Sequence, residues 1–365
     1  MDILQLLLSF VIILIGCEFF TNAVEWVGKR YNLSEGAVGS VLAAVGTAMP
    51  ETLIPIIAIV FMTGEGTNEI GVGAILGAPF MLATLAMLVM GVAVFAFRKR
   101  RNTKDLIING FLIRRDLRIF IIAYSLAAVA ALVPRELEWA RWAIGLSLIP
   151  LYIYYVYMTM FKCDSHCEGD VKSLYFNTAV CRLRNGRDYY NGVPDALTET
   201  IRKVVYPAEP PTYMIFAQLL MGLAAIILGA HLFVEQIEIL AHEIGLSPLI
   251  LALIVAPIAT ELPEKFNSVL WIRDKKDTYA MGNITGAMVF QSCIPVTIGI
   301  LLTDWHIDLY NSTQFLQACA IGIALLSGSV LYIRASDTKL HSYGLMLGGV
   351  LYALFIILVF VIGHT

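Results

Sequence analysis

The chain has 365 residues, of which 58% are hydrophobic and 15% are charged, and its mean hydropathy is +0.76. These values exclude a soluble domain, because a soluble fold cannot bury this much apolar surface, and they are typical of a polytopic helical membrane protein. The formal net charge of -3 excludes little, since in membrane proteins the placement of Lys and Arg matters more than their sum.

The first predicted element is an apolar run at the N-terminus, MDILQLLLSFVIILIGCEFF. A secretory signal peptide carries basic residues before its apolar segment, and this run has none. The lipobox-like segment Leu14–Cys17 does not change the interpretation, because cleavage there would remove most of a helix that the second half of the chain repeats. We therefore predict a membrane-spanning helix of the mature protein.

Hydropathy predicts ten membrane-spanning helices, with ends defined to within about 2–4 residues. In chain order they are Ile3–Val27, Ala37–Met62, Ile70–Phe97, Leu117–Val133, Trp139–Phe161, Thr212–Leu240, Pro248–Ile272, Tyr279–Leu302, Thr313–Ile333 and Tyr343–Ile362. The predicted fold is an all-α polytopic membrane protein. Its parts are a first five-helix repeat at residues 1–162, a cytoplasmic loop at 163–211 and a second five-helix repeat at 212–365.

Basic residues gather in alternate loops and predict the orientation. The connection between the third and fourth spans and the central loop hold the largest groups, at Arg98, Lys99, Arg100, Arg101, Lys104, Arg114 and Arg115, and at Lys162, Lys172, Arg182, Arg184, Arg187, Arg202 and Lys203. Cytoplasmic loops carry such an excess. Both termini are therefore predicted outside the cytoplasm, in the cell membrane. Because each half has an odd number of spans, the second half is inverted relative to the first.

Two stretches repeat each other at a shift of 213 residues: Leu33–Glu51 reads LSEGAVGSVLAAVGTAMPE and Leu246–Glu264 reads LSPLILALIVAPIATELPE. Each ends on a threonine followed three residues later by Pro-Glu. The same shift extends backward and places Gly16 on Gly229. The chain therefore contains an internal repeat, and with the loop charges it is predicted to be an inverted one.

The third and eighth predicted spans carry small residues four apart. Gly73 and Gly77 match Gly282 and Gly286 at a shift of 209. Small residues at this spacing let helix backbones approach closely. Ordinary helix packing accounts for most of what they do, and we expect close packing of the third span on the second to enclose the glutamate site.

Glu51 and Glu264 each lie in the middle of a run long enough to cross a bilayer. An unpaired acidic side chain there costs about 2.5–3.5 kcal/mol, so an intramembrane glutamate indicates a functional site. Pro50 and Pro263 lack an amide hydrogen, which interrupts each helix and frees backbone carbonyls. Breaks at matching positions in two halves are typical of a transporter's ion site near the membrane midplane.

The predicted chemistry of this site is the binding of a hard divalent cation. Ca²⁺ takes six to eight oxygens at about 2.3–2.6 Å. Two inverted broken helices would bring together the four carboxylate oxygens of Glu51 and Glu264. Carbonyls freed at the breaks would complete this candidate metal site, near Thr47, Ala48, Thr260 and Glu261. The hydroxyls of Thr47 and Thr260 can instead bond their own backbones.

Two residues make the halves unequal: Glu261 stands where the first half has Ala48, and Lys265 stands where it has Thr52. A second carboxylate within one turn can raise the charge density or carry a proton. Lys265 can pair with Glu261 and cancel its charge, occupy as a fixed cation a subsite that another transporter gives to a mobile one, or extend toward an interface. The sequence leaves these alternatives open.

With signatures GTAMPE at Gly46–Glu51 and ATELPE at Ala259–Glu264, and GN-x-x-G-like third helices, the chain resembles the calcium/cation antiporter superfamily of sodium/calcium exchangers. The resemblance covers nearly all of the chain except the central loop. It implies two inverted five-helix halves, with Glu51 and Glu264 as central ligands shared by calcium and by competing sodium or protons. It also implies carbonyl ligands at Thr47 and Thr260, and gating roles for the first and sixth spans.

The chain departs from this family at the additional sodium ligands. The positions of the family's serines and Asn/Asp residues are occupied by Ala48, Glu261, Ala78, Ala287, Leu82 and Gln291. The missing hydroxyls argue against coupling to three sodium ions. Protons and sodium both remain open as the counter-ion, and protons are favoured because carboxylates alone can exchange a proton for a metal.

We expect a secondary-active cation antiporter that exchanges Ca²⁺, or another divalent cation, for H⁺ or Na⁺ by alternating access. It needs no enzyme chemistry and no cofactor. Its expected partners are the lipid bilayer and inorganic cations, not nucleic acid, and the sequence is compatible with a monomer. The alternatives are a passive cation channel or ion sensor and, less favoured, an intramembrane carboxylate enzyme, since aspartyl membrane proteases use aspartates and need no inverted halves.

The central loop carries one further candidate, a soft-metal cluster at Cys163, His166, Cys167 and Cys181. Thiolate and imidazole suit Zn²⁺. The spacing fits no standard zinc finger, however, and a solvated loop with incidental cysteines is the simpler interpretation.

Overall fold

The computed structural model describes residues 3–30, 49–62, 66–161, 173–176, 210–245 and 247–362. Its main helices, in chain order, are α1 Ile3–Arg30, α4 Met49–Ile56, α5 Thr67–Met81, α6 Met87–Ala96, α8 Gly110–Leu132, α9 Glu138–Phe161, α12 Thr212–Ile244, α13 Pro248–Thr260, α14 Leu262–Arg273, α15 Asp277–Leu302, α16 Ser312–Arg334 and α17 Ser342–Ile362. The π-helical turns Ile57–Phe61 and Leu82–Ala86 continue α4 and α5, and the single turn α7 spans Arg98–Arg101.

The described chain is almost entirely helical, as predicted. Seven of its helices are long and apolar enough to cross a membrane, and two shorter apolar helices lie at Glu51–Phe61 and Pro248–Ile258. The predicted span Ala37–Met62 falls partly outside the described residues. The count of ten therefore stays a prediction, while the membrane-protein class is supported by the structure.

Local sequence explains several helix ends. The Asn109 side chain accepts hydrogen bonds from the amides of Phe111 and Leu112 and so begins α8. Asn311 does the same for α16. Such side-chain caps satisfy amides that have no partner inside the helix. Gly245 ends α12 in the left-handed region, at φ 69°, where an L side chain would be strained.

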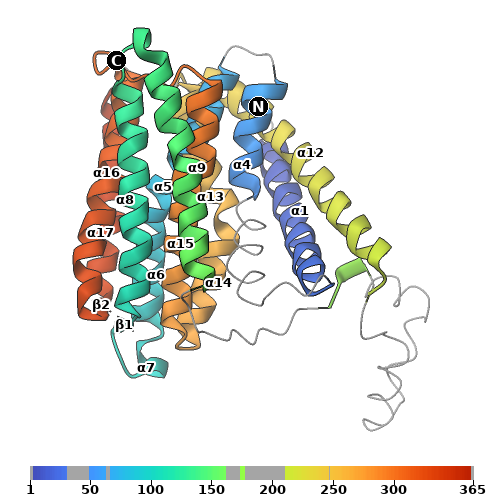
Figure 1. The fold of residues 1–365 in the computed structure, drawn as a ribbon, viewed down its shortest axis with the longest axis vertical. Coiled ribbons are helices and arrows are strands. Elements are labelled where there is room, and N and C mark those ends of the chain that lie inside the picture. Colours follow the sequence, from blue (N-terminus) through green and yellow to red (C-terminus); the bar gives the residue numbers. More distant parts are fainter. Residues whose placement is uncertain are drawn as a thin grey trace.

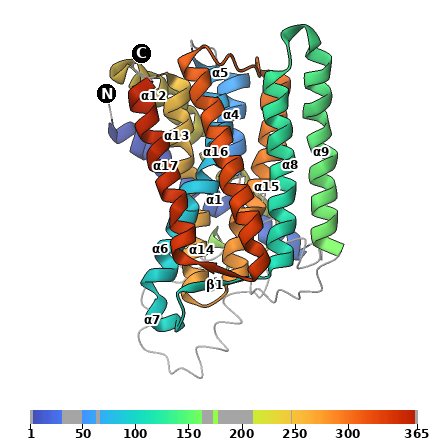
Figure 2. The ribbon, with the colours of Figure 1, turned by 90° about the vertical axis from the view of Figure 1, so that its left-hand side faces the viewer.

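One group of helices forms the larger apolar core, and we call it the main body: α5, α6, α8, α9, α14, α15, α16 and α17. The fully buried Phe80, Phe120 and Tyr124 are among its largest side chains. Hydrogen bonds to carbonyls of other helices tie it together: Tyr124 donates to Leu76 at 3.2 Å and Ser327 to Ala83 at 2.5 Å. Figure 2 shows α8 and α9 at one edge of this body.

A second apolar core lies where α1 and α12 meet α4 and α13. We call α1 and α12 the helix pair, and Figure 1 shows them side by side at one flank of the molecule. Glycines bring their backbones together: a Cβ atom on Gly16 would lie 2.9 Å from the Gly222 carbonyl oxygen, and one on Gly229 would lie 3.0 Å from the Ser9 carbonyl oxygen. Neither glycine can accept a larger residue without separating the helices.

A short two-stranded antiparallel sheet closes one end of the main body. Strand β1, Asp105–Ile107, pairs with β2, Lys339–His341, so that the buried Leu106 and Leu340 lie opposite each other. In Figure 1 this sheet and α7 lie at the end of the bundle opposite to both marked chain termini. The sheet thus joins the connection after α6 to the connection between α16 and α17.

The glycines of α5 do approach another helix closely, but the partner differs from the expectation. Cβ atoms on Gly73 and Gly77 would collide with the carbonyl oxygens of Leu249 and Leu253. These belong to α13, in the second half of the chain. Gly71 faces α4, since its Cβ would lie 3.3 Å from the Pro55 carbonyl oxygen. Helix α5 therefore packs on both helices that carry the Pro-Glu signatures.

Candidate cation site

The helix break predicted at Pro263 is present. Helix α13 ends at Thr260, Glu261 stands between the helices with φ -89° and ψ 6°, and α14 begins at Leu262 with the proline in its first turn. Pro263 has no amide hydrogen to donate to the carbonyl of Ala259, four residues earlier. On either side of the break the helical hydrogen bonds persist, since the Glu261 amide donates to the Pro257 carbonyl at 3.3 Å and the Lys265 amide donates to the Glu261 carbonyl at 3.2 Å.

A buried ion pair bridges this break. Lys265 Nζ lies 3.0 Å from Glu261 Oε2 and donates to the Pro257 carbonyl oxygen at 3.3 Å. The Glu261 side chain is 0% exposed and that of Lys265 is 7% exposed. Of the alternatives left open by the sequence, the structure therefore favours a lysine paired with Glu261 over one that extends to an interface.

Thr260 occupies the last position of α13 and is also buried. Its hydroxyl donates to the Ala256 carbonyl oxygen at 3.0 Å. The Thr260 side chain thus bonds its own helix, which was one of the two predicted roles. A ligand role for Thr260 would fall to its carbonyl.

Glu51 lies in the first turn of α4 and is buried, with 4% of its surface exposed. Pro55, four residues later, has no amide hydrogen to offer the Glu51 carbonyl. Helix α4 contacts α5, α13 and α15. The first-half glutamate is therefore buried, on a helix that packs against helices of both halves.

Three of the predicted ligand positions cannot be placed in the same detail. Thr47 and Ala48 lie outside the described residues. Glu264 lies in the first turn of α14, but its side chain is not among those described. The proposed meeting of the Glu51 and Glu264 carboxylates therefore stays a prediction.

Helix α15, which contacts α4, α5 and α14, carries a buried side-chain amide. Gln291 is 1% exposed, and within the described part of the chain neither of its amide atoms has a hydrogen-bond partner. Pro295 removes the donor for the Gln291 backbone carbonyl. At the matching positions of the first half, Leu82–Ala86 is π-helical. Both halves thus disturb the helix at this level.

The soft-metal cluster of the central loop falls outside the described residues. Within the described ranges, no group of three His, Cys, Asp or Glu side chains is placed to hold a metal ion. The loop cluster therefore stays a prediction.

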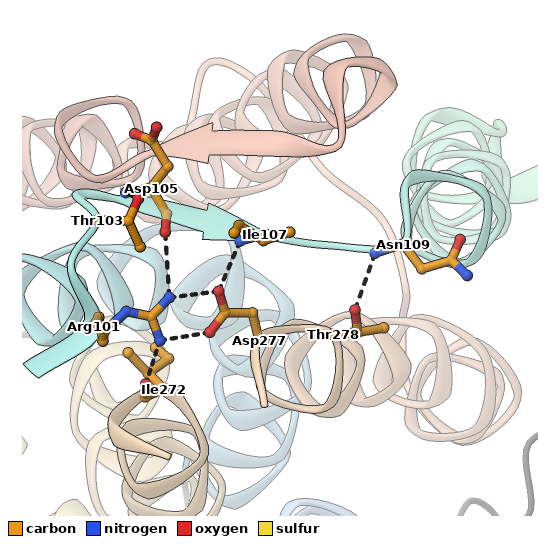
Figure 3. Close-up of polar contacts among 8 residues, drawn as sticks. All are labelled: Arg101, Thr103, Asp105, Ile107, Asn109, Ile272, Asp277 and Thr278. Carbon is orange, nitrogen blue, oxygen red and sulfur yellow. Dashed lines mark hydrogen bonds and ion pairs between the residues drawn. The ribbon is translucent and has the colours of Figure 1, made fainter. Parts of the chain in front are cut away.

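A second buried ion pair, missed by the sequence analysis, lies at the end of α14 (Figure 3). Arg101 donates to both carboxylate oxygens of Asp277, at 2.6 and 2.5 Å, and also to the Ile272 carbonyl oxygen. Asp277 in turn accepts the Ile107 amide at 2.7 Å. This network joins α7, β1, α14 and α15, and the only sequence signal for it was an acidic residue within a basic loop.

The neighbouring ion pairs of that connection are exposed. Arg100 lies 3.4 Å from Asp274, with side chains that are 64% and 40% exposed. The adjacent Arg273 guanidinium hydrogen-bonds Asp274 and holds the pKa of that carboxyl below its usual value. These contacts belong to the basic surface that the sequence analysis assigned to the cytoplasm.

A described fragment of the central loop docks on the helix pair. The amide of Phe176 donates to Gln218 Oε1 at 2.9 Å, and Gln218 Nε2 donates to Asn22 Oδ1 and to the Phe19 carbonyl oxygen, both at 2.9 Å. Tyr175 Oη donates to Glu18 at 2.5 Å. Gln218 is fully buried. The sequence analysis did not foresee this attachment, because no local pattern marks a contact between the central loop and a distant helix.

Long apolar helices, together with a helix break at a buried carboxylate, are typical of membrane transporters. The chain belongs to the sodium/calcium exchanger protein family, which it matches over residues 1–161 and 214–363. This membership confirms the predicted superfamily of calcium/cation antiporters and a transporter without enzyme chemistry.

Individual relatives are distant. The putative antiporter CaxA of Alkalimonas amylolytica is 22% identical over 324 residues, which are 88% of this chain and 88% of that protein. Two solved structures share the fold at 17% identity. A crystal structure of the H⁺/Ca²⁺ exchanger CAX has a TM-score of 0.64 and covers 98% of this chain and 81% of its own. A structure of the sodium-calcium exchanger NCX_Mj has a TM-score of 0.57, and the match covers 98% of this chain and 99% of the exchanger.

Proposed function

We propose that this protein is a secondary-active antiporter that carries Ca²⁺, or another divalent cation, in exchange for H⁺ or Na⁺ by alternating access. The observation that carries the proposal is a buried glutamate, Glu51, on helix α4, which packs against α13, the helix that ends at the Pro-Glu break of the second half. Family membership supports cation exchange as such. That the exchanged ions are a divalent cation and H⁺ or Na⁺ is part of the proposal.

The proposed site consists of Glu51 and Glu264 as central ligands, with backbone carbonyls near Thr47, Ala48, Thr260 and Glu261. Hard cations take carboxylate and carbonyl oxygens of this kind. Pro50 and Pro263 place a carbonyl without its usual helix partner close to each carboxylate. Protons are the favoured counter-ion, because the additional hydroxyl ligands for sodium are replaced by Ala48, Ala78 and Ala287.

The proposed architecture is ten spans in two inverted five-helix repeats, at residues 1–162 and 212–365, joined by the loop 163–211. One set of contacts supports the repeat. Gly16 approaches Gly222 and Ile226, and Gly229 approaches Ser9 and Ile13. A shift of 213 residues exchanges these two sets of contacts, as a twofold relation between α1 and α12 would require.

The proposed orientation has both termini outside the cytoplasm, in the cell membrane. The two marked chain ends lie at one end of the bundle, and the basic turn α7 with the sheet β1–β2 lies at the other (Figure 1). Loops rich in Lys and Arg stay in the cytoplasm. Labelling of single cysteines placed near Thr365 and near Lys99 in intact cells tests this assignment, since only the first should react with an impermeant reagent.

The decisive experiment is radiotracer Ca²⁺ uptake into vesicles that contain the purified protein, driven in turn by a pH gradient and by a sodium gradient. We expect uptake with at least one gradient and at least a hundredfold loss in Glu51→Gln and in Glu264→Gln. Glu136→Gln, at an exposed position outside the buried site, is the control and should retain uptake. Uptake that needs no counter-ion would indicate a channel, and unchanged uptake in both variants would refute the site.

A further inference from the structure

The buried pair of Lys265 and Glu261 lies where the proposed antiporter handles its ions. Glu261 is the residue between the two half-helices, and Lys265 follows Glu264 directly. Stability alone does not explain the pair, because removing two charges from water costs about as much as their attraction returns. A hydrophobic pair of the same size would serve packing equally well. Its presence at the break therefore points to a role in ion handling.

The ligands of the Lys265 ammonium are those of a bound cation. Its nitrogen lies 3.0 Å from a carboxylate oxygen of Glu261 and 3.3 Å from the Pro257 carbonyl oxygen. The same carbonyl accepts the Glu261 amide at 3.3 Å, so it belongs to the helix immediately before the break. Carboxylate and carbonyl oxygens are what a hard monovalent cation would use in this position.

The pair also determines the charge that the cargo must balance. Three glutamates, Glu51, Glu261 and Glu264, belong to the two signatures, and Lys265 offsets one of them. Two negative charges remain. One divalent cation neutralises them, and so do two monovalent cations. Because moving net charge through a low-dielectric interior is costly, both fully loaded forms are suited to cross the membrane.

We propose that Lys265 is a tethered cation that permanently occupies one cation position of the site and sets the coupling at two monovalent ions for each divalent ion. The inference rests on the proposed antiport function and specifies its stoichiometry. The lysine acts by its fixed charge and does not enter or leave with the cargo. Exchange in this ratio moves no net charge across the membrane.

The first test measures the equilibrium distribution of radiotracer Ca²⁺ across vesicles at a fixed monovalent gradient, while a potassium gradient with valinomycin sets the membrane potential. For wild-type protein we expect the same Ca²⁺ ratio at every potential. Coupling to three monovalent ions would instead move one charge per cycle, and the Ca²⁺ ratio would change about tenfold for each 59 mV. That result would overturn the proposal.

The second test uses charge variants of the pair. In Lys265→Met the loaded carrier keeps one unbalanced negative charge, so we expect the exchange rate to fall at least tenfold and to depend on the imposed potential. Glu261→Gln leaves an unbalanced positive charge, and the Ca²⁺ concentration for half-maximal uptake should rise at least tenfold. The double variant E261Q/K265M carries no unbalanced charge, so its exchange should be faster than in Lys265→Met and independent of potential.

A purely structural role for the pair predicts a different pattern. The double variant would then be no better than either single variant, and the potential dependence would not change. If Lys265→Met exchanged ions at the wild-type rate at every potential, that result would also overturn the proposal. If Lys265→Met fails to accumulate, the wild-type protein and the double variant still decide the question through their potential dependence. Absence of any coupled uptake in the wild type would instead refute the antiport function itself.

Discussion

The main body and the helix pair are built from equally apolar segments, but they are held in different ways. In the main body, 72% of the most apolar window of α5–α6 and 78% of that of α15 is buried inside the protein, whereas its outer helices α9 and α17 are buried to only 17% and 22%. The corresponding shares in α1 and α12 are 25% and 33%. Helices α1 and α12 thus both lack the deep burial of the central α5–α6 and α15, and their closest contacts are with each other.

This difference indicates which part of the molecule can move. The main body is cross-linked by buried hydrogen bonds, the Arg101–Asp277 pair and the sheet β1–β2. The helix pair meets it mainly through the smaller apolar core with α4 and α13. The gating role that the family resemblance implies for the first and sixth predicted spans would require a sliding motion of this pair against the main body.

The largest effect should come from breaking the buried ion pair of the main body. In Asp277→Asn, Arg101 keeps an uncompensated buried charge, which costs about 3–5 kcal/mol. We expect a clear fall in the midpoint temperature of unfolding in detergent. The matched control is Asp274→Asn, whose partner Arg100 is 64% exposed and whose loss should cost less than about 1 kcal/mol. Equal effects of the two substitutions would show that the buried Arg101–Asp277 pair contributes no more to stability than an exposed ion pair.

The next largest effect concerns the approach of α5 to α13. In Gly77→Ala the added Cβ collides with the Leu253 carbonyl oxygen, so the two helices must separate. Overpacking of this kind costs about 1–3 kcal/mol, and the same unfolding measurement should detect it. Gly322→Ala in α16 is the control, since within the described structure its Cβ would meet nothing within 4 Å. A stable Gly77→Ala protein would mean that α5 and α13 are not in firm contact.

The smallest effect should be local and confined to the helix pair. Gln218→Leu leaves the partly buried amide of Phe176 without its acceptor, at a cost of about 0.5–1.5 kcal/mol. We expect faster hydrogen exchange at Tyr175 and Phe176, with little change in the unfolding of the main body. Gln5→Leu, an exposed position on α1, should leave this exchange unchanged. Loss of main-body stability in Gln218→Leu would contradict the separation of the two regions.

Much of the fold could be predicted because its signals are local. Hydropathy located the long apolar helices, and Pro263 located the break between α13 and α14. The 213-residue shift also anticipated that Gly16 and Gly229 play equivalent parts, which their contacts support. Each of these inferences needs only the chemistry of a residue and its near neighbours.

The candidate site was predictable only in part. Burial of Glu51, Thr260 and Glu261 agrees with the expected location. The partner of Lys265 could not be chosen in advance, because a lysine one turn from a glutamate can pair with it or extend to an interface. The attachment of Tyr175 to Glu18 joins residues 157 positions apart, and no local pattern marks such a contact.

The sequence by itself determined the class of protein, the internal repeat and the position of the second helix break, since apolar run length and the missing amide hydrogen of proline act within a few residues. Only the tertiary structure decided that α5 packs on α13, that Lys265 binds Glu261 and that Arg101 binds Asp277. These choices depend on which surfaces meet after the helices assemble. The cost of burying a charge and the gain from close packing at a glycine both depend on that assembly and not on the neighbouring residues in the chain.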